Sequence, residues 1–249
     1  MPRYFLELRY KGTAYKGFQA QPSASTIQGE VEKAFRIISK HDIQLVTSSR
    51  TDAGVHARQN YFHFDIDVPL SADILYNLNA ILPKDIVLMD LIEVDENAHS
   101  RFHATSRVYQ YYLYNKKNPF LTDTAYYYPF RLDTEQLQLA ASVLKEYHDF
   151  TSFSKKNTDV HTFLCEIKES YWFEEGECLV YRVEANRFLR GMVRALVGTM
   201  LKVGRGSLTI EAFREIIENK DCTKADFSTP AHGLFLQHVR YPFLDKNKL

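Results

Sequence analysis

The sequence predicts an α+β fold built from two halves. Segments that alternate apolar and polar residues and segments with helical spacing follow one another as strand, helix, strand, strand, helix, strand before residue 105, and a similar order follows. Hydrophobic residues make up 45% of the 249 residues and charged residues 25%, which suits a globular core. We therefore expect halves at residues 1–104 and 105–249, each with a mixed, mainly antiparallel sheet and helices on one face, and an active cleft between them.

The first half is predicted to open with a strand over residues 3–10, where side chains alternate. A helix follows near residues 27–38, because apolar residues recur there at helical spacing and Ser25 with Gln28 forms a plausible capping box. The remaining predicted elements of this half are strands at residues 44–47, 59–68 and 86–94 and a helix at residues 72–82.

The second half is predicted to open with a tyrosine-rich strand at residues 108–114. A helix follows that is capped near Asp133 and Thr134. Two strands, at residues 162–173 and 179–185, are expected to form a hairpin around residues 174–177. The remaining predicted elements are helices at residues 188–203 and 209–219 and a closing strand at residues 235–241.

The charged residues are unevenly distributed although the formal net charge is zero, with 31 basic and 31 acidic residues. A neutral total argues against a generic polyanion binder, but residues 101–117 and 182–205 are strongly basic and predict a positive face. No apolar run is long enough to cross a membrane, the N-terminus lacks the features of a signal peptide, and Cys165, Cys178 and Cys222 fit reduced thiols. We expect a cytoplasmic protein without a membrane partner.

A short polar loop at residues 49–57 joins two apolar runs and carries Asp52 close to Arg50. Gly54 allows the backbone to turn sharply there. A carboxylate near an arginine at the end of a strand is a common place for chemistry, because a rigid scaffold presents the loop. A turn in which Asp52 caps its own backbone explains the same pattern, and spacing alone favours that interpretation.

Three other patterns have both a functional and a structural interpretation. Tyr109 lies on the tyrosine-rich strand beside basic residues, which fits a stacking surface for bases or simply the strand propensity of tyrosine. Asp65 and Asp67 suggest metal ligands, but strand alternation already explains them as a solvated face that also includes Tyr61 and His63. His56 is interpreted as support for the loop, because no serine-hydrolase motif is present.

Several further stretches match one family in order along the chain. They are Gly12 to Gln19, Arg50 to His56, His99 to Phe102 with Arg107 to Tyr111, His148 to Phe153, Asn186 to Gly198, and Gly233 to Pro242. Together these six motifs, collinear from about residue 3 to residue 242, resemble those of the TruA-type tRNA pseudouridine synthases.

The resemblance implies two ferredoxin-like or RRM-like halves and the isomerisation of uridine to pseudouridine in tRNA. The expected targets are positions 38, 39 and 40 of the anticodon stem-loop. In this reaction the N-glycosidic bond breaks, the base rotates, and a bond forms between C5 and C1′, so no cofactor and no metal is implied. The family works as a homodimer in which one tRNA touches both subunits, and we expect a homodimer here.

The resemblance also implies roles for individual residues. Asp52 matches the family nucleophile, Arg194 matches the arginine that pairs with it, and Tyr109 matches the tyrosine that stacks on the flipped base and helps to remove the C5 proton. We expect Asp52 to be ionised in a water-poor pocket. Candidates for gripping the flanking RNA backbone are Arg50, Arg101, Arg107, Arg187 and Arg190.

The chain departs from the family pattern at three places. Ser49 stands where the family usually has Gly, Phe18 stands where it has Trp, and residues 158–161 lack the usual arginine. We expect these departures to affect substrate breadth more than the reaction. Two other functions stay open, namely a non-catalytic RNA-binding protein and an aspartate-nucleophile phosphotransferase that would need Mg²⁺ ligands.

Overall fold

The structure of the chain, a computed structural model, describes residues 1–68, 70–156 and 160–244. Two compact units can be distinguished. Unit 1 comprises Met1–Thr105 together with the chain from Phe235 onward, and unit 2 comprises Ser106–Leu234. The sequence predicts a boundary close to Thr105 but assigns the closing strand to the second half. From Phe235 onward that strand groups with unit 1 instead, where Phe235 and Leu236 pair with His56 and Ala57.

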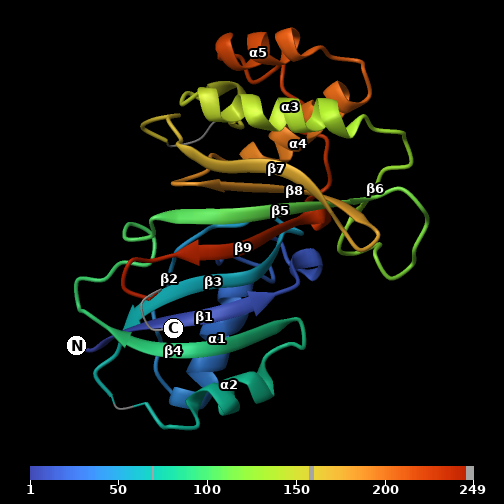
Figure 1. Cartoon of the computed structure of the whole chain (residues 1–249). Helices are drawn as coiled ribbons and strands as arrows, with labels where there is room; N and C mark the ends of the chain where they lie inside the picture. The colour runs from blue at the N-terminus through green and yellow to red at the C-terminus, as the bar shows by residue number, and fades with distance from the viewer. Residues whose placement is uncertain (69, 157–159, 245–249) are drawn as a thin grey trace. The chain divides into compact units, whose positions relative to one another are not determined.

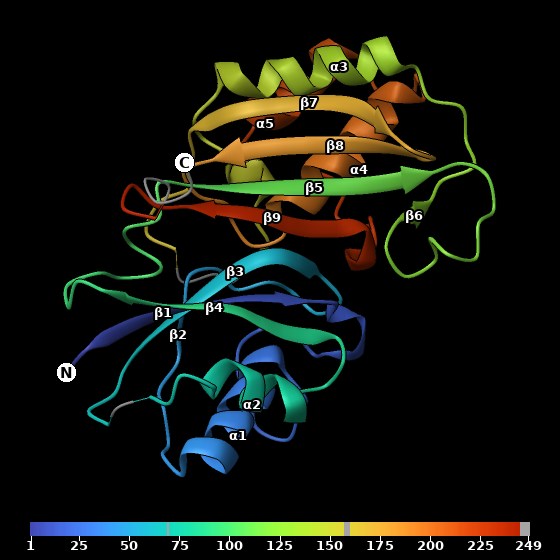
Figure 2. The same ribbon diagram turned by 60° about the horizontal axis from the view of Figure 1, so that its bottom comes forward.

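Unit 1 contains a mixed sheet with two helices on one face (Figures 1 and 2). The sheet strands lie in the order β4 (Ile86–Val94), β1 (Arg3–Tyr10), β3 (His56–Asp65) and β9 (Leu234–Arg240), and β2 (Val46–Thr47) pairs with β3. β1 is antiparallel to both β3 and β4, whereas β9 is parallel to β3. The helices are α1 (Ile27–Ser39) and α2 (Ile74–Ile81). The predicted order of strands and helices is confirmed in this unit.

Helix α1 covers the face of the sheet that carries Phe62 and Phe64. The ring of Phe35 lies 5.3 Å from that of Phe64, and both side chains are buried. The helix starts at Ile27 because the Thr26 side chain accepts a hydrogen bond from the backbone N–H of Gly29 at 3.2 Å. The predicted cap, Ser25, is therefore wrong by one residue; its hydroxyl donates to Glu30 at 3.1 Å.

The alternation predicts that the opposite face of β3 is solvated. In the structure this face is largely buried instead. Tyr61 and His63 are 3% and 5% exposed. The Tyr241 ring meets that of Tyr61 edge-on at 5.3 Å, and Phe5 packs against Tyr241 at 5.2 Å. These contacts come from the segment after β9, more than 170 residues away in sequence from β3, so local alternation could not reveal them. The end of this face at Asp65, and Asp67 just beyond β3, are exposed as predicted.

His63 makes the stability of this face depend on pH. Burial, and then the charges of His99 and Arg3, lower the pKa of His63 to about 4, and Asp65 opposes this only in part. The unfolded chain, with an ordinary histidine pKa near 6.5, therefore binds more protons than the folded chain between these values. We expect the free energy of unfolding to fall as the pH drops from about 6.5 to 4, by up to about 3 kcal/mol from this residue.

The measurement is urea unfolding of the wild type and of His63→Asn across that pH range. The variant should lose part of the slope, whereas His41→Asn, at an exposed site, should retain it. Identical slopes for all three proteins would contradict the assignment.

Unit 2 contains an antiparallel sheet in the order β5 (Ser106–Tyr114), β8 (Cys178–Ala185) and β7 (Ile167–Glu175), with the short β6 (Tyr126–Tyr127) paired parallel to β5. Helices α3 (Thr134–Val143) and α4 (Met192–Gly204) pack on this sheet and on each other, and α5 (Ile210–Glu218) packs on these two helices (Figure 2). Asp133 caps α3, as predicted, by accepting hydrogen bonds from the backbone of Glu135 and Gln136. No helix in the described part of either unit is long and apolar enough to cross a membrane.

Two predicted boundaries in unit 2 are wrong. Helix α4 begins at Met192 rather than Phe188, because Gly191 has a φ of +76° and breaks the helical path before it. Strand β7 begins at Ile167 rather than near residue 162, because the preceding segment turns away to bond His148 through the N–H of Cys165. Residues 186–191 thus form the connection between β8 and α4, and this connection carries two of the predicted site residues, Arg187 and Arg190.

Candidate active site

The loop that carries Asp52 lies in unit 1 between β2 and β3. The carbonyl oxygen of Asp52 accepts a hydrogen bond from the N–H of Val55 at 3.1 Å, which closes a tight turn. Gly54 has a φ of +82° inside this turn, so the predicted need for a glycine there is confirmed. Asp52 is half-buried and Arg50 is exposed. The turn therefore fixes the backbone from which the Asp52 carboxylate projects.

Buried polar side chains hold the start of the loop. The hydroxyl of Thr51 lies 2.8 Å from that of Tyr10. The amide of Asn60 donates to the carbonyl oxygen of Ser49 at 3.0 Å and accepts from the Ser48 hydroxyl at 2.7 Å. Asn60 is fully buried, so these bonds form without competition from water. Ser49 keeps a negative φ and fits this network, so its side chain introduces no backbone strain into the loop.

The Gly12 to Gln19 stretch packs directly on the Asp52 loop. A Cβ atom on Gly12 would lie 2.0 Å from the carbonyl oxygen of Val55, so only glycine allows this approach. The N–H of Gly12 donates to Nδ1 of His56 at 3.0 Å, and the His56 ring stacks on Phe235 at 4.5 Å. The N–H of Phe18 donates to the carbonyl oxygen of Thr51 at 3.1 Å. The interpretation of His56 as loop support is confirmed.

The side chain of Phe18 contributes to this support through packing. Its ring lies 5.4 Å from that of Tyr10 and 5.0 Å from that of Phe62, and it is almost fully buried. The position that carries Trp in the resembled family therefore lies in the core of unit 1 in this chain, and the smaller ring is well packed there.

The Asp52 side chain has no hydrogen bond or ion pair within unit 1 among the residues that the structure describes. By contrast, two other acidic residues on or beside β3, Asp65 and Glu7, are committed to partners. Asp65 receives two hydrogen bonds from the Arg3 guanidinium at 2.7 Å each, and the Glu7 carboxylate accepts from the hydroxyl of Tyr61 at 2.6 Å. A carboxylate on a rigid loop that is not bonded within its own unit is available to act as a nucleophile.

Tyr109 and Arg194 lie in unit 2. Tyr109 is a buried residue of β5, and its ring meets that of Phe188 edge-on at 5.1 Å. Tyr111 shares a face of β5 with Tyr109, because side chains two apart on a strand point the same way. The positive charge of Arg194 acts on the Tyr111 phenol, although burial dominates and raises the pKa of Tyr111. The structure thus brings Tyr109 and Arg194 to the same face of β5.

Arg194 is held in place by the segment before the last strand. Its Nε donates to the carbonyl oxygen of Thr229 at 2.7 Å, and the Thr229 hydroxyl donates to the carbonyl oxygen of Arg194 at 2.8 Å. The hydroxyl of Tyr111 donates to Pro230 at 2.7 Å, which fixes the same segment. Arg194 is therefore not a freely solvated side chain on the surface of α4. Its guanidinium is oriented through Nε, and within unit 2 the described residues show no other bond to it.

The predicted RNA-gripping arginines have different surroundings. Arg50 and Arg190 are exposed, and Arg187 is half-buried beside the Cys165 thiol. Arg101 is exposed, with its guanidinium 5.8 Å from the Phe102 ring centre. Arg107 donates from Nη1 to the carbonyl oxygen of Asn186 at 2.9 Å, so part of its guanidinium holds the connection between β8 and α4.

Two residues of the candidate site were missed in the sequence. Asn60 holds the Asp52 loop. The feature of the sequence that points to it is a polar amide side chain on the strand face that otherwise carries Phe62 and Phe64. Lys155 lies against Gly191, where a Cβ atom would approach its side chain to 3.1 Å, and its N–H donates to the carbonyl oxygen of Arg190 at 3.0 Å. Its only signal is a pair of lysines after the Phe150 to Phe153 stretch. Residues 158–161 lack the arginine that the resembled family usually has there. Of this segment, Thr158 and Asp159 lie outside the described residues.

The other candidate chemistries are poorly supported by their surroundings. Because Asp65 is bound by Arg3 through both oxygens, the pair Asp65 and Asp67 does not form a free carboxylate site for Mg²⁺. Burial raises the pKa of the Cys165 thiol to about 11 and also raises that of Cys178. Neither thiol is therefore a thiolate nucleophile at neutral pH.

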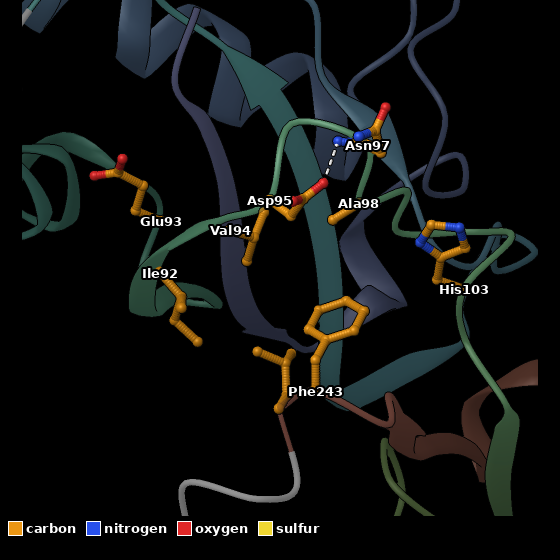
Figure 3. A pocket seen from close by; sticks show the side chains of 9 residues that line it. Ile92, Glu93, Val94, Asp95, Asn97, Ala98, His103 and Phe243 are labelled. Atoms are coloured by element: carbon orange, nitrogen blue, oxygen red, sulfur yellow. Dashed lines mark hydrogen bonds between the residues drawn. The ribbon is translucent and has the colours of Figure 1, made fainter.

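A pocket of about 330 Å³ in unit 1 contains none of the predicted site residues (Figure 3). Glu93, Asp95, His103 and Phe243 are among the residues that line it. The Asp95 carboxylate accepts a hydrogen bond from the N–H of Asn97 at 2.8 Å. Two carboxylates in the lining would repel a phosphate backbone, so this pocket is not part of the candidate active site.

Together, these features define an α+β protein that presents a carboxylate on a rigid loop in one unit and an anchored arginine beside a tyrosine strand in the other. A family model described as tRNA pseudouridine synthase matches residues 140–242. The chain is 48% identical to tRNA pseudouridine synthase A of Parabacteroides distasonis over 245 residues, which cover 97% of both chains. It is 37% identical to tRNA pseudouridine synthase A of Bacillus subtilis over 239 residues, which cover 94% of this chain and 97% of the relative. The chain belongs to the TruA-type tRNA pseudouridine synthase family.

Proposed function

We propose that the chain isomerises uridine to pseudouridine in tRNA, at positions 38, 39 and 40 of the anticodon stem-loop. The observation that carries this proposal is the Asp52 loop. Asn60 bonds the loop backbone at Ser49, Gly12 packs against the backbone of Val55, and Tyr10 bonds the Thr51 hydroxyl, while the Asp52 carboxylate has no partner within unit 1 among the described residues. Family membership supplies the reaction that such a carboxylate serves.

In the proposed reaction Asp52 attacks the target uridine, either at C6 of the base or at C1′ of the sugar. The bond between N1 and C1′ breaks, the base rotates, and a bond forms between C5 and C1′. The proton on C5 leaves to solvent, N1 of the base takes up a proton from solvent, and Asp52 is released unchanged, so atoms and electrons balance without an added reactant. Tyr109 stacks on the flipped base and assists removal of the C5 proton, and Arg194 pairs with the Asp52 carboxylate.

Binding of the tRNA is assigned to basic residues and to a second copy of the chain. The exposed Arg50, Arg101 and Arg190 are suited to contact phosphates that flank the flipped uridine. Arg187 lies in the connection between β8 and α4, and Arg107 bonds to that connection at Asn186. We expect a homodimer in which one tRNA contacts both subunits. We also expect the protein to act in the cytoplasm, where its three free cysteines stay reduced.

The test is release of tritium from a tRNA transcript labelled at C5 of uridine. The wild type should release one tritium for each pseudouridine formed, because the C5 proton is the only one lost. Transcripts with cytidine at positions 38, 39 and 40 should release none. Addition of a chelator should leave the rate unchanged.

Each alternative function gives a different result in the same assay. Tight tRNA binding with no tritium release would support a non-catalytic RNA-binding protein instead. Loss of activity on chelation would favour metal-dependent chemistry. Release from transcripts that lack the three target uridines would contradict the assigned positions.

A further inference from the structure

A row of three contacting rings in unit 1, each tilted relative to the next, ends at an exposed phenylalanine. The buried His63 ring lies 4.5 Å from the His99 ring, and the His99 ring lies 4.2 Å from that of Phe102 at an interplanar angle of 35°. Phe102 itself is 73% exposed. A ring with one side on a stack and the rest in water is unusual for a loop residue with no role, because burying an aromatic ring is strongly favourable.

The loop that carries Phe102 is built to hold this ring in place. Nδ1 of His99 accepts hydrogen bonds from the backbone N–H groups of Arg101 at 3.1 Å and Phe102 at 3.4 Å. The N–H of His103 donates to the carbonyl oxygen of His99 at 3.0 Å, which closes the turn. Burial, and then the charges of Arg3, His103 and Arg101, lower the pKa of His99, so its ring is neutral at neutral pH and keeps the lone pair that these bonds require. The exposed ring is therefore preorganised.

A cation accompanies the exposed ring. The Arg101 guanidinium carbon lies 5.8 Å from the Phe102 ring centre, and Arg101 is itself exposed. A fixed aromatic face beside an arginine is the combination that binds unpaired bases, because the ring stacks on any base while the cation attracts the phosphate next to it. A lipid surface or an apolar protein partner would need a larger apolar patch than a single ring.

We propose that Phe102 and Arg101 form a stacking platform for one unpaired nucleobase of the bound tRNA, separate from the uridine that reacts at Asp52. This inference rests on the proposed function only in taking tRNA as the ligand. The His63 and His99 rings act as positioning residues, since they hold Phe102 in a fixed orientation rather than contact the RNA.

The first experiment measures binding of an unmodified tRNA transcript to Phe102→Ala, Phe102→Tyr and the wild type. We expect Phe102→Ala to weaken binding about tenfold, in line with the loss of one stacked base, and Phe102→Tyr to bind within about twofold of the wild type. The matched control is Tyr76→Ala, because Tyr76 is a 77% exposed aromatic residue of the same unit on α2. This control should bind like the wild type. Urea unfolding should show that all four proteins are folded under the binding conditions, with stabilities that differ by no more than the loss of one ring contact, since the substituted rings are mostly exposed.

The second experiment places a fluorescent ring on the platform. Trp172, the one tryptophan of the chain, is buried, so Phe102→Trp adds an exposed reporter whose signal is the difference from the wild type. Addition of the transcript should quench this added fluorescence, because a stacked base quenches an indole. Equal binding by Phe102→Ala and the wild type, or no quenching on binding, would overturn the proposal. Quenching that follows protein concentration without RNA would also overturn it, in favour of contact with a second copy of the chain.

The two proposals can fail separately. A wild type that binds the transcript but releases no tritium, together with quenching of the added fluorescence in the Phe102→Trp protein, would sink the proposed function but support the platform. A wild type that releases tritium, together with a Phe102→Ala variant that binds and reacts normally, would leave the function standing and remove the platform.

Discussion

Replacing Asp52 with Asn is expected to lower tritium release from tRNA by at least about 10³-fold, with little change in tRNA binding. The amide keeps nearly the same size and shape but is a far weaker nucleophile than a carboxylate. The side chain of Asp52 has no bond within unit 1 among the described residues, so the substitution breaks no contact that holds the loop. The turn depends on the Asp52 carbonyl oxygen and on Gly54, and both remain.

Two further variants make this prediction sharp. Asp52→Ala should be as inactive as Asp52→Asn. Because alanine cannot convert to aspartate, this variant shows whether residual activity of Asp52→Asn comes from slow conversion of the amide back to the acid. Asp67→Asn changes an exposed carboxylate just beyond β3 and should react like the wild type. If Asp52→Asn and Asp52→Ala both kept more than about a tenth of the activity, Asp52 would not be the nucleophile.

Local patterns in the sequence predict most of the elements but not where buried faces lie. The alternation in β1 and the spacing in α1 locate both elements closely, because each depends on neighbours in sequence. The assignment of Tyr61 and His63 to a solvated face fails, because Tyr241 covers that face from the far end of the chain. The cap of α1 differs by one residue because Ser25 and Thr26 are both good caps, and only tertiary contacts choose between them.

The candidate site shows the same division between local and distant information. The turn at Asp52 follows from Gly54, two residues away. That Arg194 is anchored rather than solvated depends on Thr229, which is 35 residues away and carries no motif that predicts the contact. The support given by Gly12 depends on Val55, and a glycine in a loop gives no sign of which backbone approaches it.

Replacing Gly12 with Ala is expected to destabilise the protein by about 2–4 kcal/mol and to reduce tritium release as well. The added Cβ would lie 2.0 Å from the carbonyl oxygen of Val55 and 2.8 Å from its carbonyl carbon, and both atoms are backbone, so the chain itself must move. Val55 closes the turn that begins at Asp52. A shift there also weakens the bond from the Gly12 N–H to His56, so the carboxylate loses its fixed position.

The control separates steric conflict from the general cost of removing a glycine. Gly206 has a φ of +71° with open space around its Cβ position, so Gly206→Ala should cost only about 1 kcal/mol and leave the rate unchanged. Gly12 has no positive φ, so its substitution tests the close approach alone. Urea unfolding and tritium release on the same three proteins provide the comparison. Equal stability of the two variants would show that the Gly12 stretch does not hold the Asp52 loop, whereas a loss of rate larger than the loss of folded protein would show that it positions the nucleophile.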